Sequence, residues 1–224
     1  MTETYLDHIV IGAKSLEAGQ AFIKERLGVE IPLGGEHTKM GTHNLLMQLG
    51  NHTFLEVISI SDTLTPPDRP RWYGLDDPHV QFSLEREPML LTWVVNSNNL
   101  QKLIQQASYS LGASEPISRG DLNWFFGLPE DGRLLAGGLL PYAMQWCTDQ
   151  HPSQRMANLK CSLKSLTIAH PYPDWIHQAL TSIDAQHLVE LKKLTDNQAP
   201  YFSVEISTPS GFKTLHSCTG PSQC

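Results

Sequence analysis

The sequence has few cysteines and no long apolar run, and each absence excludes a class of protein. Its 224 residues include only four cysteines, Cys147, Cys161, Cys218 and Cys224, with no CxxC pair among them. This spacing does not match a zinc cluster, and it favours reduced cysteines in a cytoplasmic protein. No stretch approaches the roughly 18 apolar residues of a membrane span. The N-terminus lacks a basic region followed by an apolar core, so we expect no secretory signal and no membrane partner.

Basic runs and cofactor motifs are also missing. The formal net charge is -7, and no basic run is longer than Lys192-Lys193. Nucleic acid is therefore not expected as a partner, because phosphate backbones need clustered Lys and Arg. The sequence has no Gly-rich phosphate loop, no GxSxG and no HExxH. These absences argue against a nucleotide cofactor, a serine hydrolase and a zinc protease.

The segments that are present predict a first unit over residues 1–60. "YLDHIVIGA" is an apolar strand, and "SLEAGQAFIKERLG" is a helix with Ser15 as its N-cap and Gly28 as its end. Three short strand-like segments bounded by Gly or Asn follow, and each predicts a strand. The unit therefore has the order βαβββ.

The rest of the chain predicts a second unit and an extension. Residues 61–88 are rich in Pro and Asp, which predicts a long connection with a helical turn near Trp72. Residues 89–150 repeat the βαβββ order, and residues 160–216 predict an appended βαββ piece. We therefore expect an α+β fold, in which tandem βαβββ units form a curled mixed sheet around a cleft and the C-terminal piece packs on them.

Two polar residues stand out within apolar strands. His8 lies in the first strand, and Glu56 lies in "TFLEVISI", the fourth strand of the first unit. A carboxylate in an apolar strand costs free energy unless it is paired or binds a metal. The pair can form half of a divalent-metal site, or act as base and orienter in proton transfer. In the third interpretation, the two side chains only hydrogen-bond each other.

Further polar and aromatic residues are candidates for ligand contacts. If His43 points outward, strand alternation points Asn44 inward, where its amide can bind a ligand carbonyl. Arg69 in the connection and Arg119 at the edge of the second unit can each pair with the carboxylate of an anionic substrate. Trp93, on a predicted strand, can line a pocket.

The order of several motifs resembles a known superfamily. These motifs are "LDHIVIGA", "GTHNLLMQLGNHTFLEVISI", "LPEDGRLLAGGLLPYAMQW" and the closing "EISTPSG". Together, over roughly residues 4–216, they resemble the glyoxalase/bleomycin-resistance/extradiol-dioxygenase superfamily, also called vicinal oxygen chelate proteins. More narrowly, they resemble glyoxalase-like domain proteins of the longer type.

The resemblance implies a metal site that is only partly present. Metal-dependent members of the superfamily take ligands from the first and fourth strands of both units. His8 and Glu56 match in the first unit, whereas the second unit offers Thr92, a poor ligand, and Gln145, a weak one. The resemblance therefore implies a divalent metal (Zn, Ni, Mn or Fe) at His8 and Glu56. It does not imply ordinary glyoxalase I activity or extradiol ring cleavage.

Two functions follow from the resemblance. The first is a lyase or isomerase acting on a small oxygenated or carbonyl compound, with Glu56 and His8 as catalytic residues. Its substrate contacts would be Asn44, Arg69, Trp93, Arg119 and Gln145. The alternative is a non-catalytic protein that binds and sequesters a small molecule, as bleomycin-resistance proteins do. Such units also exchange partners between chains, which makes a homodimer compatible with either function.

Overall fold

The structure is a computed structural model, and the residues that it describes are 3–50, 52–148, 150–195 and 197–217. Cys218 and Cys224 lie outside these ranges, while Cys147 and Cys161 are free thiols. Among the described helices, none is long and apolar enough to cross a membrane.

The first unit has the expected order of one strand, one helix and three strands. Its elements are β1 (Thr4–Gly12), α1 (Leu16–Leu27), β2 (Leu33–His37), β3 (Thr42–Gln48) and β4 (Phe54–Ile60). The helix begins where Oγ of Ser15 accepts a hydrogen bond from N of Ala18 at 3.2 Å, and it ends at Gly28. Both caps expected from the sequence are confirmed.

The second unit repeats this order. Its elements are β5 (Met89–Ser97), α3 (Leu100–Gln106), β6 (Ala113–Arg119), β7 (Leu122–Leu128) and β8 (Tyr142–Trp146). A 3₁₀ turn at Leu135–Gly138 separates the last two strands, and a second one at Pro152–Arg155 follows β8.

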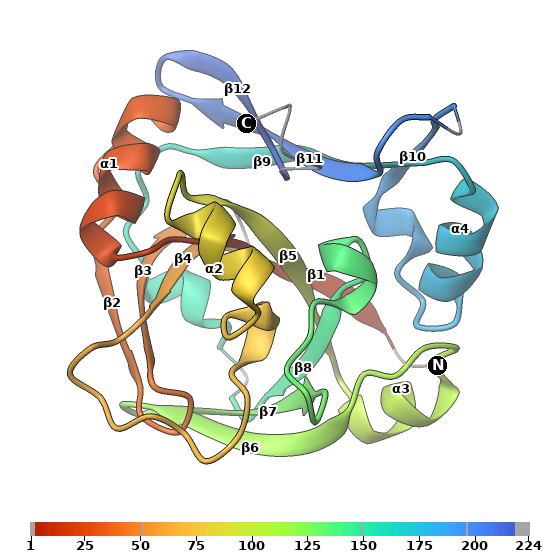
Figure 1. The fold of residues 1–224 in the computed structure, drawn as a ribbon, viewed down its shortest axis with the longest axis horizontal. Coiled ribbons are helices and arrows are strands. Elements are labelled where there is room, and N and C mark those ends of the chain that lie inside the picture. The colour runs from red at the N-terminus through yellow and green to blue at the C-terminus, as the bar shows by residue number, and fades with distance from the viewer. Residues whose placement is uncertain (1–2, 51, 149, 196, 218–224) are drawn as a thin grey trace.

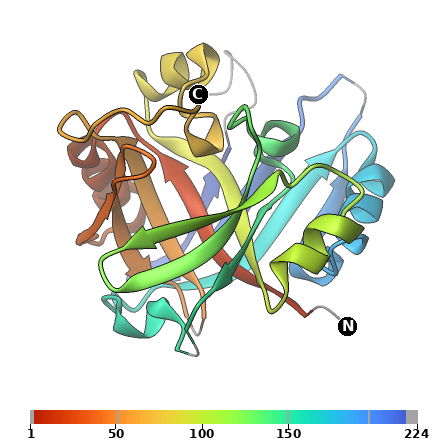
Figure 2. The same ribbon diagram turned by 90° about the horizontal axis from the view of Figure 1, so that it is seen from below.

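The two units form one eight-stranded mixed sheet in the order β2-β3-β4-β1-β5-β8-β7-β6. β1 pairs parallel with β4 and antiparallel with β5, so the units join along their first strands. The sheet curls until its two ends approach each other (Figures 1 and 2). There, Nζ of Lys39 lies 2.9 Å from a carboxylate oxygen of Glu115 on β6. The predicted curled sheet is confirmed.

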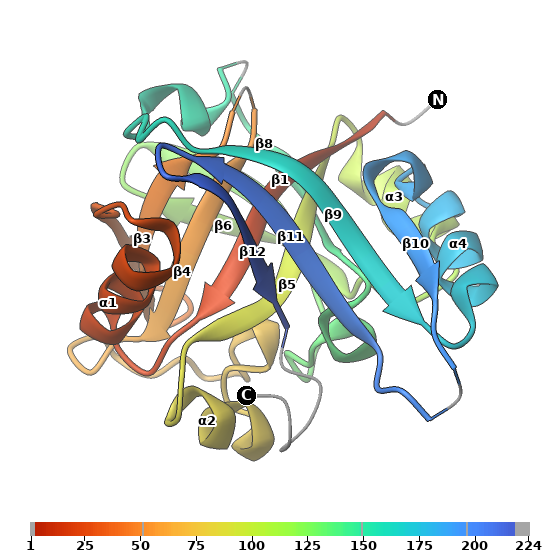
Figure 3. The same ribbon diagram turned by 90° about the horizontal axis from the view of Figure 1, so that it is seen from above.

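The connection between the units covers one end of the curled sheet. It contains the expected helical turn at Trp72–Gly74, followed by α2 (Pro78–Leu84). Figure 1 shows this segment in front of the curled sheet, and Figure 3 shows it at the end of the strands. The amide of Gly74 donates to the carbonyl of Gly132 at 2.8 Å, which ties the connection to the second unit.

The C-terminal piece forms a second sheet on the outer face of the first. Its elements are β9 (Ser162–His170), α4 (Pro173–Thr181), a 3₁₀ turn (Gln186–Leu188), β10 (Glu190–Lys193), β11 (Tyr201–Thr208) and β12 (Gly211–His216). The strand order is β10-β9-β11-β12, so the piece has one more strand than the expected βαββ. Figure 3 shows this sheet lying across β1, β4 and β5. The central strands of the first sheet are therefore buried on both faces.

Candidate active site

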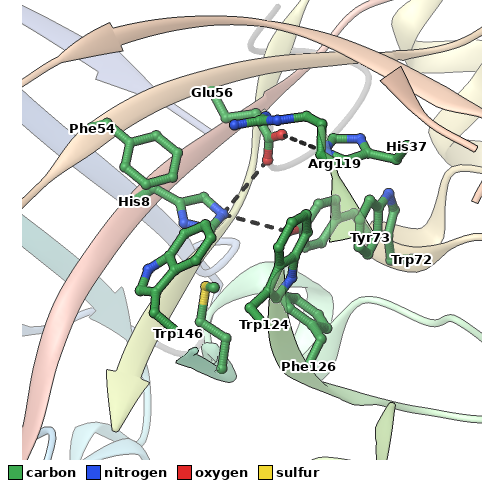
Figure 4. Close-up of a pocket in the computed structure, with 11 residues that line it drawn as sticks. His8, His37, Phe54, Glu56, Trp72, Tyr73, Arg119, Trp124, Phe126 and Trp146 are labelled. Carbon is green, nitrogen blue, oxygen red and sulfur yellow. Dashed lines mark hydrogen bonds and ion pairs between the residues drawn. The ribbon is translucent and has the colours of Figure 1, made fainter. Parts of the chain in front are cut away.

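A small pocket lies inside the curled sheet (Figure 4). Its polar wall consists of His8, His37, Glu56, Tyr73 and Arg119, and its apolar wall consists of Phe54, Trp72, Trp124, Phe126, Met144 and Trp146. The cavity has a volume of about 20 Å³. This is the room that about one water needs.

One ring nitrogen of His8, on β1, faces the pocket. Nδ1 lies 2.6 Å from Oδ1 of Asp7, whereas Nε2 lies 3.5 Å from Oε2 of Glu56 and 3.4 Å from the hydroxyl of Tyr73. The ring stacks on Phe54, with 4.5 Å between the ring centroids. These contacts hold the imidazole in one orientation, with Nε2 toward the pocket (Figure 4).

Asp7 reaches His8 because β1 is irregular at this point. Leu6 pairs with Val95 and His8 pairs with Val94, so Asp7 has no partner on β5. An extra residue of this kind is a β-bulge, which disrupts the strict alternation of side chains along a strand. The carboxylate and the imidazole of two consecutive residues can therefore meet.

The Asp7 carboxylate is fully buried and receives three side-chain donors. Besides His8, Nε1 of Trp146 donates to Oδ2 at 2.7 Å and Nε2 of His151 lies 3.0 Å from the same oxygen. Burial by itself raises the pKa of Asp7, but the hydrogen bonds from His151 and His8 outweigh it and lower the pKa to about 2. Asp7 is therefore ionised near neutral pH and accepts all three hydrogen bonds.

The hydrogen bonds fix the tautomers of both histidines. The backbone N–H of Ser153 donates to Nδ1 of His151 at 3.2 Å, so the proton of the neutral ring lies on Nε2, which faces Asp7. Since Asp7 is an acceptor, the proton of His8 lies on Nδ1. Nε2 of neutral His8 therefore presents a lone pair to the pocket.

Glu56 of β4 is oriented by an amide. Nδ2 of Asn44 donates to Oε1 of Glu56 at 2.5 Å, and Oδ1 of Asn44 accepts from the backbone N of Gly35 at 3.0 Å. Asn44 is buried and is not part of the pocket wall, so it lies behind Glu56. Oε2, the oxygen that Asn44 does not bind, is the one that faces His8.

Tyr73 and His37 complete the polar wall in their neutral forms. Burial, together with the nearby Glu56 carboxylate, raises the pKa of the Tyr73 phenol well above its usual value. Burial, reinforced by the charge of Arg119, lowers the pKa of His37 well below its usual range. Tyr73 has a φ of 59°, a left-handed conformation that costs a residue with a side chain about 1–2 kcal/mol. The residue in this strained conformation is therefore the one whose hydroxyl faces His8.

The structure brings only some of the predicted ligand contacts together. Arg119 lines the pocket with His8 and Glu56, whereas Arg69 lines a separate hollow of about 790 Å³. Trp93 is fully buried in the core and its indole N–H donates to the carbonyl of Leu139 at 3.0 Å. The side-chain oxygen of Gln145 accepts from the backbone N of Leu100 at 2.9 Å, at the start of α3. Trp93, Gln145 and Arg69 therefore lie outside the pocket.

The donor set does not fit a metal bound by both units. Among the described residues, no three or more His, Cys, Asp or Glu are arranged to hold one ion. His8 and His37 approach opposite oxygens of Glu56, and one of these oxygens is already bonded to Asn44. Thr92 is buried with its hydroxyl 3.4 Å from the carbonyl of Trp93. The second unit lines the pocket with Arg119 and apolar side chains, which supply no metal ligand of the superfamily type.

Several site residues do not follow from the pattern of the sequence. Asp7 is next to His8 in the sequence, but only the β-bulge lets its carboxylate reach the imidazole of His8. His37 ends a polar strand, Tyr73 lies in the irregular connection, and His151 follows β8 in a polar segment. No sequence spacing links these three residues to β1.

Two βαβββ units joined in one curled sheet around a pocket form the architecture of the vicinal oxygen chelate superfamily. Here, among the described residues, only the first unit places polar residues of its first and fourth strands, His8 and Glu56, in the pocket. The model of the glyoxalase-like domain family matches residues 6–183, and the chain belongs to this family. A search of the curated proteins found no match.

Several solved structures are similar to this chain at low sequence identity. A hypothetical protein from Staphylococcus aureus is 13% identical with a TM-score of 0.60, over 98% of this chain and 87% of that one. A mutant of 4-hydroxymandelate synthase from Streptomyces coelicolor is 13% identical with a TM-score of 0.47, over 96% of this chain and 63% of that one. Methylmalonyl-CoA epimerase from Mycobacterium tuberculosis is 16% identical with a TM-score of 0.36, over 63% and 85%.

Proposed function

We propose that the protein is an enzyme that moves a proton in a small oxygenated or carbonyl compound, as an isomerase or a lyase. One observation carries the proposal: Oε2 of Glu56 and Nε2 of His8 face the same buried pocket, 3.5 Å apart. Each is held from behind, Glu56 by Asn44 and His8 by Asp7. Buried side chains held in this way are pre-organised for acid–base chemistry.

The arrangement supports removal of a proton from a carbon next to a carbonyl group. Glu56 takes the proton on Oε2, and the electron pair of the broken C–H bond moves to the carbonyl oxygen. Tyr73 keeps its own proton and can donate a hydrogen bond to that oxygen as negative charge develops. His8 can receive the proton from Glu56 on Nε2. Return of the proton to another position gives an isomerase, and loss of a leaving group gives a lyase.

The proposed steps use the protein's own side chains. A bound divalent metal would polarise the substrate oxygens, but the first unit alone supplies the donors for it, so no step is assigned to a metal. The predicted homodimer and the cytoplasmic location remain predictions that the fold does not test.

Hydrogen exchange tests the proposed reaction. The protein is incubated in deuterated buffer with a panel of small aldehydes, ketones and 2-oxo acids, and loss of the α-proton signal is followed by NMR. We expect exchange with at least one compound, and a fall of about 100-fold or more in Glu56→Gln. Glu25→Gln, an exposed change of the same kind on α1, should exchange like wild type. Absence of enzyme-dependent exchange across the panel would count against the proposal.

A second function is favoured by the apolar wall of the pocket. Trp124, Phe126, Met144 and Trp146 come from the second unit, and the indole N–H of Trp146 is already used by Asp7. Such a wall suits a protein that binds and sequesters a small molecule. A compound that binds in the pocket without α-proton exchange would favour this function over the enzyme.

A further inference from the structure

Arg119 is the charged pocket residue that the proposed reaction does not use. Among the described residues, its guanidinium makes no hydrogen bond and no ion pair. Other arginines of the chain have such partners: Arg71 and Arg155 lie 2.6 and 2.8 Å from carboxylate oxygens of Asp76 and Asp121. A guanidinium with five unused donors beside a pocket is suited to bind an anion.

The sequence makes room for this side chain at the edge of the pocket. Arg119 is the last residue of β6, which approaches β2 where the curled sheet nearly closes. A Cβ on Gly35 of β2 would lie 3.0 Å from Cδ of Arg119, which is too close for an ordinary contact. Gly35 therefore lets the stem of Arg119 pass, and the guanidinium reaches the region of Glu56 and His37 (Figure 4).

The electrostatics of the pocket favour an anionic ligand at Arg119. Burial lowers the pKa of Arg119, and the Glu56 carboxylate opposes this shift. The guanidinium remains charged because its ordinary pKa is so high. His37 beside it is neutral. A partly buried cation without a hydrogen-bonded partner is costly, and a carboxylate from a ligand would remove this cost through bidentate hydrogen bonds.

We propose that the substrate is a short 2-oxo or 2-hydroxy carboxylic acid whose carboxylate binds Arg119. Arg119 and Glu56 line the same pocket, so an acid held by its carboxylate presents its neighbouring carbons to Glu56 and Tyr73. The small cavity excludes a bulky acid. The assignment of the reacting carbon rests on the proposed function, whereas binding of the carboxylate rests on Arg119.

Binding of small probes tests this inference without any turnover. Trp72, Trp124 and Trp146 line the pocket, so their indole N–H signals in ¹H–¹⁵N spectra report an occupant. Pyruvate, lactate and the uncharged methyl pyruvate are titrated into the wild-type protein. We expect saturable shifts with at least one of the two acids, and binding of methyl pyruvate about tenfold or more weaker than that of pyruvate.

Variants assign the binding to one side chain. Arg119→Gln should weaken binding of the acid by about tenfold or more, and Arg119→Lys should retain part of it because the charge remains. Arg155→Gln, which removes an exposed arginine, should bind like wild type. Thermal melting checks that each variant is folded.

Three results would overturn the inference: no binding of either acid, equal binding of methyl pyruvate, or unchanged binding in a folded Arg119→Gln. Its failure can be told apart from failure of the proposed function. Acid that binds through Arg119 without α-proton exchange supports the carboxylate site and contradicts the enzyme. Exchange with methyl pyruvate but not with pyruvate supports the enzyme and contradicts the carboxylate site.

Discussion

His151, 144 residues after Asp7 in the chain, donates its Nε2–H to the Asp7 carboxylate at 3.0 Å. Asp7 in turn holds Nδ1 of His8, so a residue beyond the second unit sets the orientation of a pocket residue in the first. The buried Asp7 carboxylate therefore connects His8 of the first unit with His151, which follows the second unit.

The two histidines on Asp7 should have opposite tautomers. We expect His8 to carry its proton on Nδ1 and His151 to carry its proton on Nε2, because Ser153 donates its backbone N–H to Nδ1 of His151. Long-range ¹H–¹⁵N correlation spectra at neutral pH measure this directly, with assignments from His8→Gln and His151→Gln. A His151 ring protonated on Nδ1 would contradict the network.

The buried Asp7 carboxylate should make the folded state sensitive to acid. Its pKa is about 2 in the folded protein, against an ordinary value of 3.8. Because the pKa of Asp7 is lower in the folded state, its contribution to stability is fully present above the pKa of the unfolded state. This contribution is lost as the pH falls through the pKa of the folded state. The shift corresponds to about 2 kcal/mol. Denaturant unfolding of wild type and Asp7→Asn should show their difference in stability shrinking by about this amount between roughly pH 5 and pH 2. A pH-independent difference would refute it.

Gly132 should be needed to hold the segment that carries Tyr73. Its φ is 65°, and a Cβ there would lie 2.0 Å from the carbonyl oxygen of Arg71. Gly132→Ala should therefore cost about 3 kcal/mol or more in the free energy of unfolding. Gly137 is the matched control, because it has the same φ and no atom within 4 Å of its Cβ position. Gly137→Ala should cost only about 1–2 kcal/mol, from the backbone strain alone. Equal losses would show that the contact with Arg71 is unimportant.

Metal content should be well below one ion per chain. Glu56, His8 and His37 come from the first unit, and the second unit adds no His, Cys, Asp or Glu to the described pocket wall. Mass spectrometry for Zn, Ni, Mn and Fe on protein purified without chelator measures this, with Glu56→Ala as the comparison. Near-stoichiometric metal that disappears in Glu56→Ala would contradict the prediction and restore the metal site that the resemblance implies.

The sequence predicted the repeated units because their signals are local. Apolar alternation, the N-cap at Ser15 and the end of α1 at Gly28 depend on neighbouring residues only, and the structure confirms them. His8 and Glu56 also meet as expected, since residues of the first and fourth strands are brought together by the pairing of β1 with β4.

Tertiary structure decided which faces of the strands line the pocket. The second sheet covers the outer face of β1, β4 and β5, so apolar residues lie on both faces and alternation cannot tell inward from outward. Trp93 is therefore in the core and not in the pocket. The sequence could not show the bulge at Asp7 either, because it arises from the register of β1 against β5.

By itself, the sequence determined the order of the elements and the placement of His8 and Glu56 on paired strands, because strand and helix periodicity is a local property. Only the tertiary structure decided that Tyr73 and Arg119 line the pocket and that His151 binds Asp7. These residues are contributed by the connection, a sheet edge and the segment after β8, and only the closing of the curled sheet brings them within reach of Asp7, His8 and Glu56.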